Sequence, residues 1–154
     1  MAEASVIVNR AARLLSDKEF TYWTSADLLD WLNEGVQQLV QLRPDASQAA
    51  VVISLVPGVR QTIPETANQL IRVDCNVGGA SIVQVRRDDM DAFHPAWRND
   101  DANSQASEYM MDKQAPKFFW VYPPSEGTGE VEAIVSQVPT PVTAPADDIG
   151  LGDE

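Results

Sequence analysis

Apolar and polar residues in the first forty positions of the chain recur with the period of an α-helix. In about residues 3–16 the apolar side chains share one stripe: Ile7, Ala11, Leu14 and Leu15, with Val8 beside it. In about residues 25–42 the stripe contains Leu28, Leu32, Val36 and Leu39, with Leu29 and Val40 widening it. The pattern predicts two helices, and the short connector between them predicts an antiparallel helical hairpin.

The second helix also has clear signals at its ends. Thr24 is a good N-cap, and Asp27 stands three residues later, as in a capping box. Pro44 predicts an end near Leu42. Gly35 is unfavourable inside a helix, so either another backbone approaches closely there or the residue is tolerated without a role.

From about residue 49 to residue 137 the period changes to that of β-strands. We expect three hairpins, each with a glycine-containing turn, which pair segments 51–56 with 59–63, 71–77 with 83–85, and 118–122 with 130–136. In segment 71–77 the apolar face contains Ile71, Val73, Cys75 and Val77. Residues 87–97 predict a short helical turn. The fold class is therefore α+β, with the helical hairpin packed against antiparallel β-hairpins in a single domain over residues 1–137.

Residues 138–154 form a Pro-rich, acidic tail that we expect to be extended and disordered in the isolated chain. Pro139, Pro141 and Pro145 exclude both a helix and a regular strand ladder. Such a pre-stiffened segment loses less entropy on docking than a flexible one. The tail is therefore either a strap that orders on a neighbouring subunit or portal, or a passive end.

The composition narrows the class of partner. The chain has 154 residues and a formal net charge of −12, and no basic residue follows Lys117. An acidic surface repels nucleic-acid phosphates and bilayer headgroups, so we expect neither specific DNA binding nor membrane binding. No apolar run reaches the roughly 18 residues of a membrane span. Cys75 is the only cysteine, which excludes an internal disulfide.

The sequence offers no convincing catalytic, cofactor or metal site. His94 precedes Pro95 in a polar segment and has no Gly-flanked serine to activate. Cys75 lies on the apolar face of a predicted strand, which favours a buried, inert thiol. The densest carboxylates could in principle hold Mg²⁺ or Ca²⁺, although their order does not fit an EF-hand loop: Asp88, Asp89, Asp91, Asp100 and Asp101. We therefore expect a protein that is not an enzyme.

Several segments resemble, in order along the chain, the phage adaptor proteins, which are the head-to-tail connector subunits beneath the portal. One is Asp27-Leu28-Leu29-Asp30-Trp31-Leu32-Asn33-Glu34-Gly35, and another is Phe119-Trp120-Val121-Tyr122-Pro123-Pro124. Further matches lie at residues 7–17, 23–24, 43–46, 63–64, 70–73 and 95–97. Similar proteins commonly continue into further helices after the second hairpin, where this chain has its Pro-rich tail.

This resemblance implies a structural subunit of the virion, located in the neck and assembled in the host cytoplasm. The implied partners are the portal protein, neighbouring copies in a ring, usually twelvefold, and tail or nozzle proteins, with DNA passing through without specific binding and no cofactor. We expect the assembly contacts at Trp97, Val138, Pro139, Pro141 and Val142. Alternatives are a head-completion or tail-terminator protein, a monomeric protein-binding module, and a metal-dependent enzyme built on the aspartates.

Overall fold

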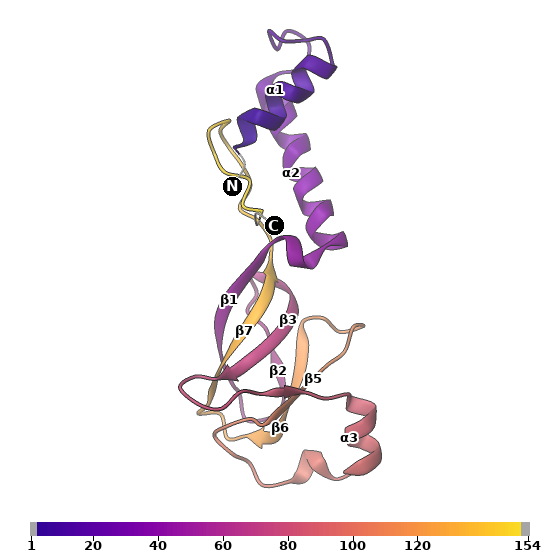
Figure 1. Cartoon of the computed structure of the whole chain (residues 1–154), viewed down its shortest axis with the longest axis vertical. Coiled ribbons are helices and arrows are strands. Elements are labelled where there is room, and N and C mark those ends of the chain that lie inside the picture. The colour runs from indigo at the N-terminus through magenta and orange to yellow at the C-terminus, as the bar shows by residue number, and fades with distance from the viewer. Residues whose placement is uncertain (1–2, 152–154) are drawn as a thin grey trace. The chain divides into compact units, whose positions relative to one another are not determined.

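Helices α1 (Ala4–Leu14) and α2 (Ser25–Leu42) belong to one unit of the protein, together with the short 3-10 turn η1 (Pro44–Ala46) and the C-terminal segment (Figure 1). The computed structural model describes residues 3–151. Within them, residues 3–47 and 138–151 make up what we call the helical unit, and residues 48–137 make up the β unit. The α+β class is confirmed, and β7, the last strand, ends where the predicted tail begins.

The predicted start and end of α2 are confirmed. The Thr24 hydroxyl accepts a hydrogen bond from the Asp27 N–H at 3.2 Å, and the Asp27 carboxylate accepts one from the Thr24 N–H at 2.9 Å. This reciprocal pair is a capping box. The helix ends at Leu42, two residues before Pro44.

The connector between the helices is held by one carboxylate. Asp17, which is 7% exposed, accepts hydrogen bonds from the backbone N–H groups of Thr21, Tyr22 and Trp23 at 2.8–2.9 Å. These donors, with that of Trp23 first, hold the pKa of the Asp17 carboxyl below its usual value. The charged carboxylate thus fixes the path of the chain into α2.

Small residues form the buried face of α1, and this differs from the prediction. Ala4, Val8 and Ala12 are at most 3% exposed, whereas Ile7 and Leu14 are 42% and 80% exposed. The predicted stripe lies about 100° around the helix from the real one. Short side chains let neighbouring segments approach the α1 backbone closely, so the larger apolar side chains face outward.

The C-terminal segment packs against the helices of its own chain instead of being an isolated tail. Val142 and Ile149 are buried with Val8, Leu28 and other core residues of the two helices. The Asn33 side-chain amide donates to the Val142 carbonyl at 2.9 Å and accepts from the Val142 N–H at 2.8 Å. The segment has no helix or strand, as its prolines predict, but it is a third layer of the helical unit.

The same segment also completes the start of α1. Glu3, the N-cap residue, makes no side-chain cap. The N–H groups of Ala4 and Ser5 instead donate to the carbonyls of Asp147 and Pro145 at 3.0 and 2.7 Å. Because the first N–H groups of a helix have no partner within the helix, the C-terminal segment supplies the missing acceptors.

Two sheets pack face to face in the β unit. One sheet has the order β1-β7-β3, and the other has the order β2-β6-β5-β4. Their strands are β1 (Gln48–Ser54), β2 (Gly58–Thr62), β3 (Ala67–Asn76), β4 (Val83–Gln84), β5 (Glu108–Met111), β6 (Phe118–Ser125) and β7 (Glu130–Gln137). One core contains side chains from both sheets, including Ile53 and Val131 from the first and Phe119 and Val121 from the second. The β unit is therefore a small sandwich.

The predicted strands exist, but the predicted hairpins are wrong. β1 pairs with β7, β2 pairs with β6, and β6 and β7 lie in different sheets. β4 pairs in parallel with β5, although an isolated antiparallel bridge joins Cys75 and Ser81 after the glycine turn. After each predicted turn, the next strand lies in the other sheet.

The predicted apolar face of β3 is only partly correct. The buried positions are Ala67, Leu70, Val73 and Asn76, so they are three residues apart instead of two. The pairing of β3 with β7 shifts register at three places, and each irregularity changes which side chain points to the core. The Asn76 side chain is consequently buried, where it donates to the Ala106 carbonyl at 2.7 Å and accepts from the Ala106 N–H at 2.9 Å.

A short helix, α3 (Arg87–Phe93), and a 3-10 turn, η2 (Trp97–Asn99), lie between β4 and β5. The helix agrees with the predicted helical turn. Within the described residues, no helix combines the length and the apolar composition that a membrane span requires.

The packing of α2 leads to a first prediction about stability. Leu28 is 4% exposed in the helical core, so Leu28→Ala should lower the free energy of unfolding by about 2–5 kcal/mol. Thr24→Ala removes only the cap and should cost about 1 kcal/mol. Urea denaturation followed by circular dichroism measures both. A larger loss for the Thr24 variant would contradict the helical core described above.

The Asn33 contact leads to a second prediction. Asn33→Ala leaves the partly buried N–H and carbonyl of Val142 without their partners, which should cost about 1–3 kcal/mol. Amide hydrogen exchange at Val142 should accelerate at the same time. Gln37→Ala, at an exposed position of the same helix, is the matched control. Unchanged exchange at Val142 would show that Asn33 does not hold the segment.

Candidate protein interface on the helical unit

The helical unit carries most of the exposed large apolar side chains of the described chain. Leu14 and Leu42 are 80% and 81% exposed, Tyr22 is 84% exposed, and Trp31 is 48% exposed. The Trp31 ring lies against the ring of Trp23, with the centroids 5.0 Å apart. Single exposed apolar residues are ordinary, but a surface where they gather marks a site of protein–protein contact.

Trp31 is one of the residues that line an apolar groove of about 410 Å³ between α1 and α2. α1 contributes Ile7, Val8 and Ala11, the C-terminal segment contributes Ile149 and Leu151, and α2 contributes Leu28, Trp31, Leu32, Gly35, Val36 and Leu39. No charged residue lines the groove. Such a surface suits the apolar face of another protein segment better than a polar ligand.

Gly35 leaves space in the wall of this groove. In the described part of the chain, apart from neighbouring backbone of its own helix, no heavy atom lies within 4 Å of the position that a Cβ at Gly35 would take. The close backbone approach that we considered for Gly35 is therefore absent within the chain. The space at Gly35 is open to a partner.

The predicted assembly contacts lie in different surroundings. Trp97 is 0% exposed, and its indole N–H donates to Asp91 at 2.8 Å. Val142 and Pro139 are also buried, whereas Val138 and Pro141 are exposed. Of these five residues, only Val138 and Pro141 are accessible to a partner in this fold. That the five residues form assembly contacts stays a prediction. The groove was not predicted, because the apolar pattern of α1 placed Ile7 and Leu14 in the core.

Two of the aspartates considered for a metal site, Asp91 and Asp100, are bonded to side chains of the protein. Asp91 accepts hydrogen bonds from Arg98 at 2.7 Å and from Trp97, and both hold the pKa of its carboxyl below the usual value. Asp100 accepts from the Tyr122 hydroxyl at 2.8 Å and lies 2.7 Å from the His94 ring nitrogen. His94 first and Tyr122 second lower the pKa of the Asp100 carboxyl. No group of three or more potential metal ligands gathers within residues 3–151.

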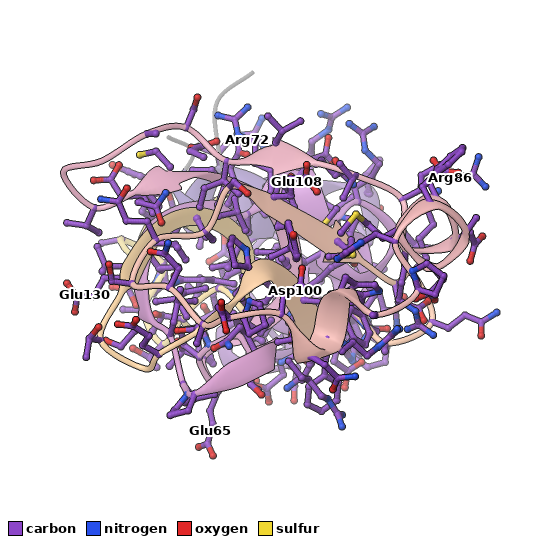
Figure 2. The ribbon with its side chains drawn as sticks, turned by 90° about the horizontal axis from the view of Figure 1, so that it is seen from below. Glu65, Arg72, Arg86, Asp100, Glu108 and Glu130 are labelled. Atoms are coloured by element: carbon purple, nitrogen blue, oxygen red, sulfur yellow. The ribbon has the colours of Figure 1, made fainter. Side chains whose placement is uncertain are left out.

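Charges of both signs lie around the β unit. Figure 2 shows Glu65, Glu130 and Arg86 pointing outward at separate places on its edge. Cys75 is half-buried, and its Sγ atom lies 3.5 Å from a Glu132 oxygen. Burial first and the Glu132 carboxylate second raise the pKa of the Cys75 thiol, which makes it a weaker nucleophile at neutral pH.

A second hollow, of about 480 Å³, lies among loops of the β unit. It is open and polar, and Glu130 is the one ionisable residue in its lining, which also contains Ser54, Asn76, Val77, Ser104, Gln105, Gly127, Thr128 and Gly129. A lone exposed carboxylate has no acid or base partner there. The apolar groove of the helical unit is therefore the stronger candidate for a functional surface.

Comparison with known families agrees with a role in assembly. The sequence matches the family described as SU10 adaptor protein over residues 2–154. No curated protein matches the chain. The match extends over the sequence of both units.

The contacts of Asp91 lead to a prediction of pH dependence. Because the pKa of Asp91 is lower in the folded protein, its contribution to stability is complete above the unfolded value of about 3.9 and is lost as the pH falls through the folded value. Asp91→Asn should lower the melting temperature at neutral pH and reduce the further loss below about pH 4. The Trp97 indole N–H signal in NMR should shift in the variant.

Asp89→Asn is the matched control, since the Asp89 side chain is exposed and has no bonded partner among the described residues. It should leave both the melting temperature and the Trp97 signal unchanged. Identical acid profiles for wild type and Asp91→Asn would contradict this role of Asp91.

Proposed function

The chain belongs to the SU10 adaptor protein family, and we propose that it is a structural virion subunit that connects the head of a tailed phage to its tail. In this proposal, copies of the chain form a ring, usually twelvefold in such connectors, between the portal protein and the tail or nozzle proteins. The ring lies in the neck of the virion and is assembled in the host cytoplasm. The chain has no catalytic role and needs no cofactor.

The observation that carries the proposal is the exposed apolar surface of the helical unit. A connector subunit has to contact several protein neighbours at once, and apolar surface is the main source of stable protein association. Leu14 and Leu42 are 80% and 81% exposed, and Trp31, although it packs against Trp23, is 48% exposed. A monomer that kept such a surface in water would be prone to aggregate.

The charge of the chain supports the passage of DNA without binding. The formal net charge is −12, and Glu126, Glu130 and Glu132 are exposed on the β unit. Carboxylates repel the phosphate backbone of DNA. Lys and Arg residues give affinity for DNA through counterion release, and this affinity is weak in a protein with an excess of acidic residues. An acidic ring would let DNA slide through its channel without gripping it.

Mixing the chain with its portal protein tests the proposal. We expect electron microscopy to show closed rings seated on the portal, and mass photometry to show a monomer or small oligomer for the chain alone, because like charges oppose self-association. The portal supplies symmetry that offsets the cost of ordering the subunits.

The portal alone and the chain alone are the controls. A chain that remains monomeric in the presence of its portal would contradict the proposal and favour a monomeric binding module. Rings that bind the distal end of a tail tube but not the portal would favour a tail-terminator protein.

A further inference from the structure

The two helices of the helical unit carry charges of opposite sign. The charged residues of α1 are Arg10 and Arg13, and α1 has no acidic residue. The charged residues of α2 are Asp27, Asp30 and Glu34, and α2 has no basic residue. This segregation differs from the β unit, where exposed charges of both signs are intermixed.

Apart from Asp27, which belongs to the capping box, the charged residues of the two helices form no ion pair among the described residues. Among residues 3–151, no ion pair forms at Arg10, Arg13, Asp30 or Glu34, although oppositely charged residues are present in the same unit. Arg10 and Arg13 lie opposite the buried face of α1, on the exposed face with Val6 and beside Leu14. The outer surface of α1 is thus apolar and basic.

On α2 the acidic residues lie on the exposed side of the helix, opposite its buried face. Asp27, Asp30 and Glu34 follow one helical stripe, and Trp31 lies next to it at the edge of the groove. The groove is therefore apolar, and the acidic stripe lies beyond Trp31 at its edge. The outer face of α1 and the border of α2 are complementary both in charge and in apolar character.

A surface whose two halves complement each other fits a second copy of the same chain. We propose that the outer face of α1 in one copy packs against the α1–α2 groove of a second copy, with Arg10 and Arg13 facing Asp30 and Glu34. Gly35 gives the incoming helix room to approach the α2 backbone. The inference rests on the proposed function, and it identifies the contact between neighbouring subunits.

The contact joins two different faces of the molecule. Contacts of this heterologous type generate closed rings when the rotation between subunits closes, whereas a contact between identical faces stops at a dimer. The described part of the C-terminal segment need not move, because only Ile149 and Leu151 of residues 138–151 line the groove.

Charge reversal tests the proposal. In the variant Arg10→Glu/Arg13→Glu, two acidic faces meet at the contact. In the variant Asp30→Arg/Glu34→Arg, two basic faces meet. Each variant alone should therefore form rings on the portal at least about tenfold less efficiently than wild type. An equal mixture of the two variants restores both contacts around an alternating ring. Assembly should recover in that mixture. Arg72→Glu/Arg86→Glu, at exposed positions of the β unit, is the control for the α1 variant, because it changes the net charge by the same amount as Arg10→Glu/Arg13→Glu. It should assemble normally.

Gly35 provides a second, independent test. A Cβ at position 35 has open space around it, so Gly35→Trp should extend an indole ring into the groove and assemble about tenfold less efficiently or worse. Gly35→Ala is the matched control and should assemble as wild type. Circular dichroism of each variant confirms its fold.

Separate outcomes decide the two proposals. Normal rings from both charge-reversed variants and from Gly35→Trp would overturn the contact between α1 and the groove, while the connector function would stand. Loss of assembly in either charge-reversed variant without recovery in the mixture would also overturn it. A wild-type chain that forms no ring on its portal would overturn both.

Discussion

The helical unit depends on a constraint of area, because two helices alone cannot bury all the apolar surface that they carry. Each helix needs a partner along its apolar stripe, but two helices that pack together cover only the sides that face each other. The C-terminal segment provides the missing layer on one side. Val142 and Ile149 fill the core, Asn33 holds the Val142 backbone, and the carbonyls of Pro145 and Asp147 complete α1. The helical unit therefore exists as a unit only with the last part of the chain in place.

The same constraint explains which apolar residues remain in water. The small face of α1 is used inside, where Ala4 and Ala12 permit close packing, and the large residues Ile7 and Leu14 remain outside. Burying a residue such as Leu contributes about 1.5–3 kcal/mol, so this arrangement leaves part of the possible stabilisation unused in the isolated chain. It becomes available when a partner covers the surface.

Features that depend on residues close in sequence were predicted correctly, whereas features that depend on contacts between distant residues were not. The Thr24–Asp27 capping box, the end of α2 before Pro44 and the existence of most strands follow from local chemistry, and all are present. Strand pairing is non-local: β1 and β7 lie about as far apart in sequence as the β unit allows, yet they pair. For α1, both Ile7–Ala11–Leu14 and Ala4–Val8–Ala12 have helical spacing, and choosing between them requires knowledge of what packs against the helix. The groove could not be predicted, because its existence depends on that choice.

The role of the C-terminal segment limits how assembly can proceed. If this segment left its place to reach a neighbour, Val8 and Leu28 would lose their cover, and α1 would lose two hydrogen-bond acceptors at its start. Those losses would offset much of what the new contact contributes. A partner that uses the outer face of α1 and the open part of the groove requires no such rearrangement, and its surfaces are already formed in the free chain. Association between preformed surfaces avoids the cost of ordering, so the folded C-terminal segment favours docking of whole subunits over exchange of tails.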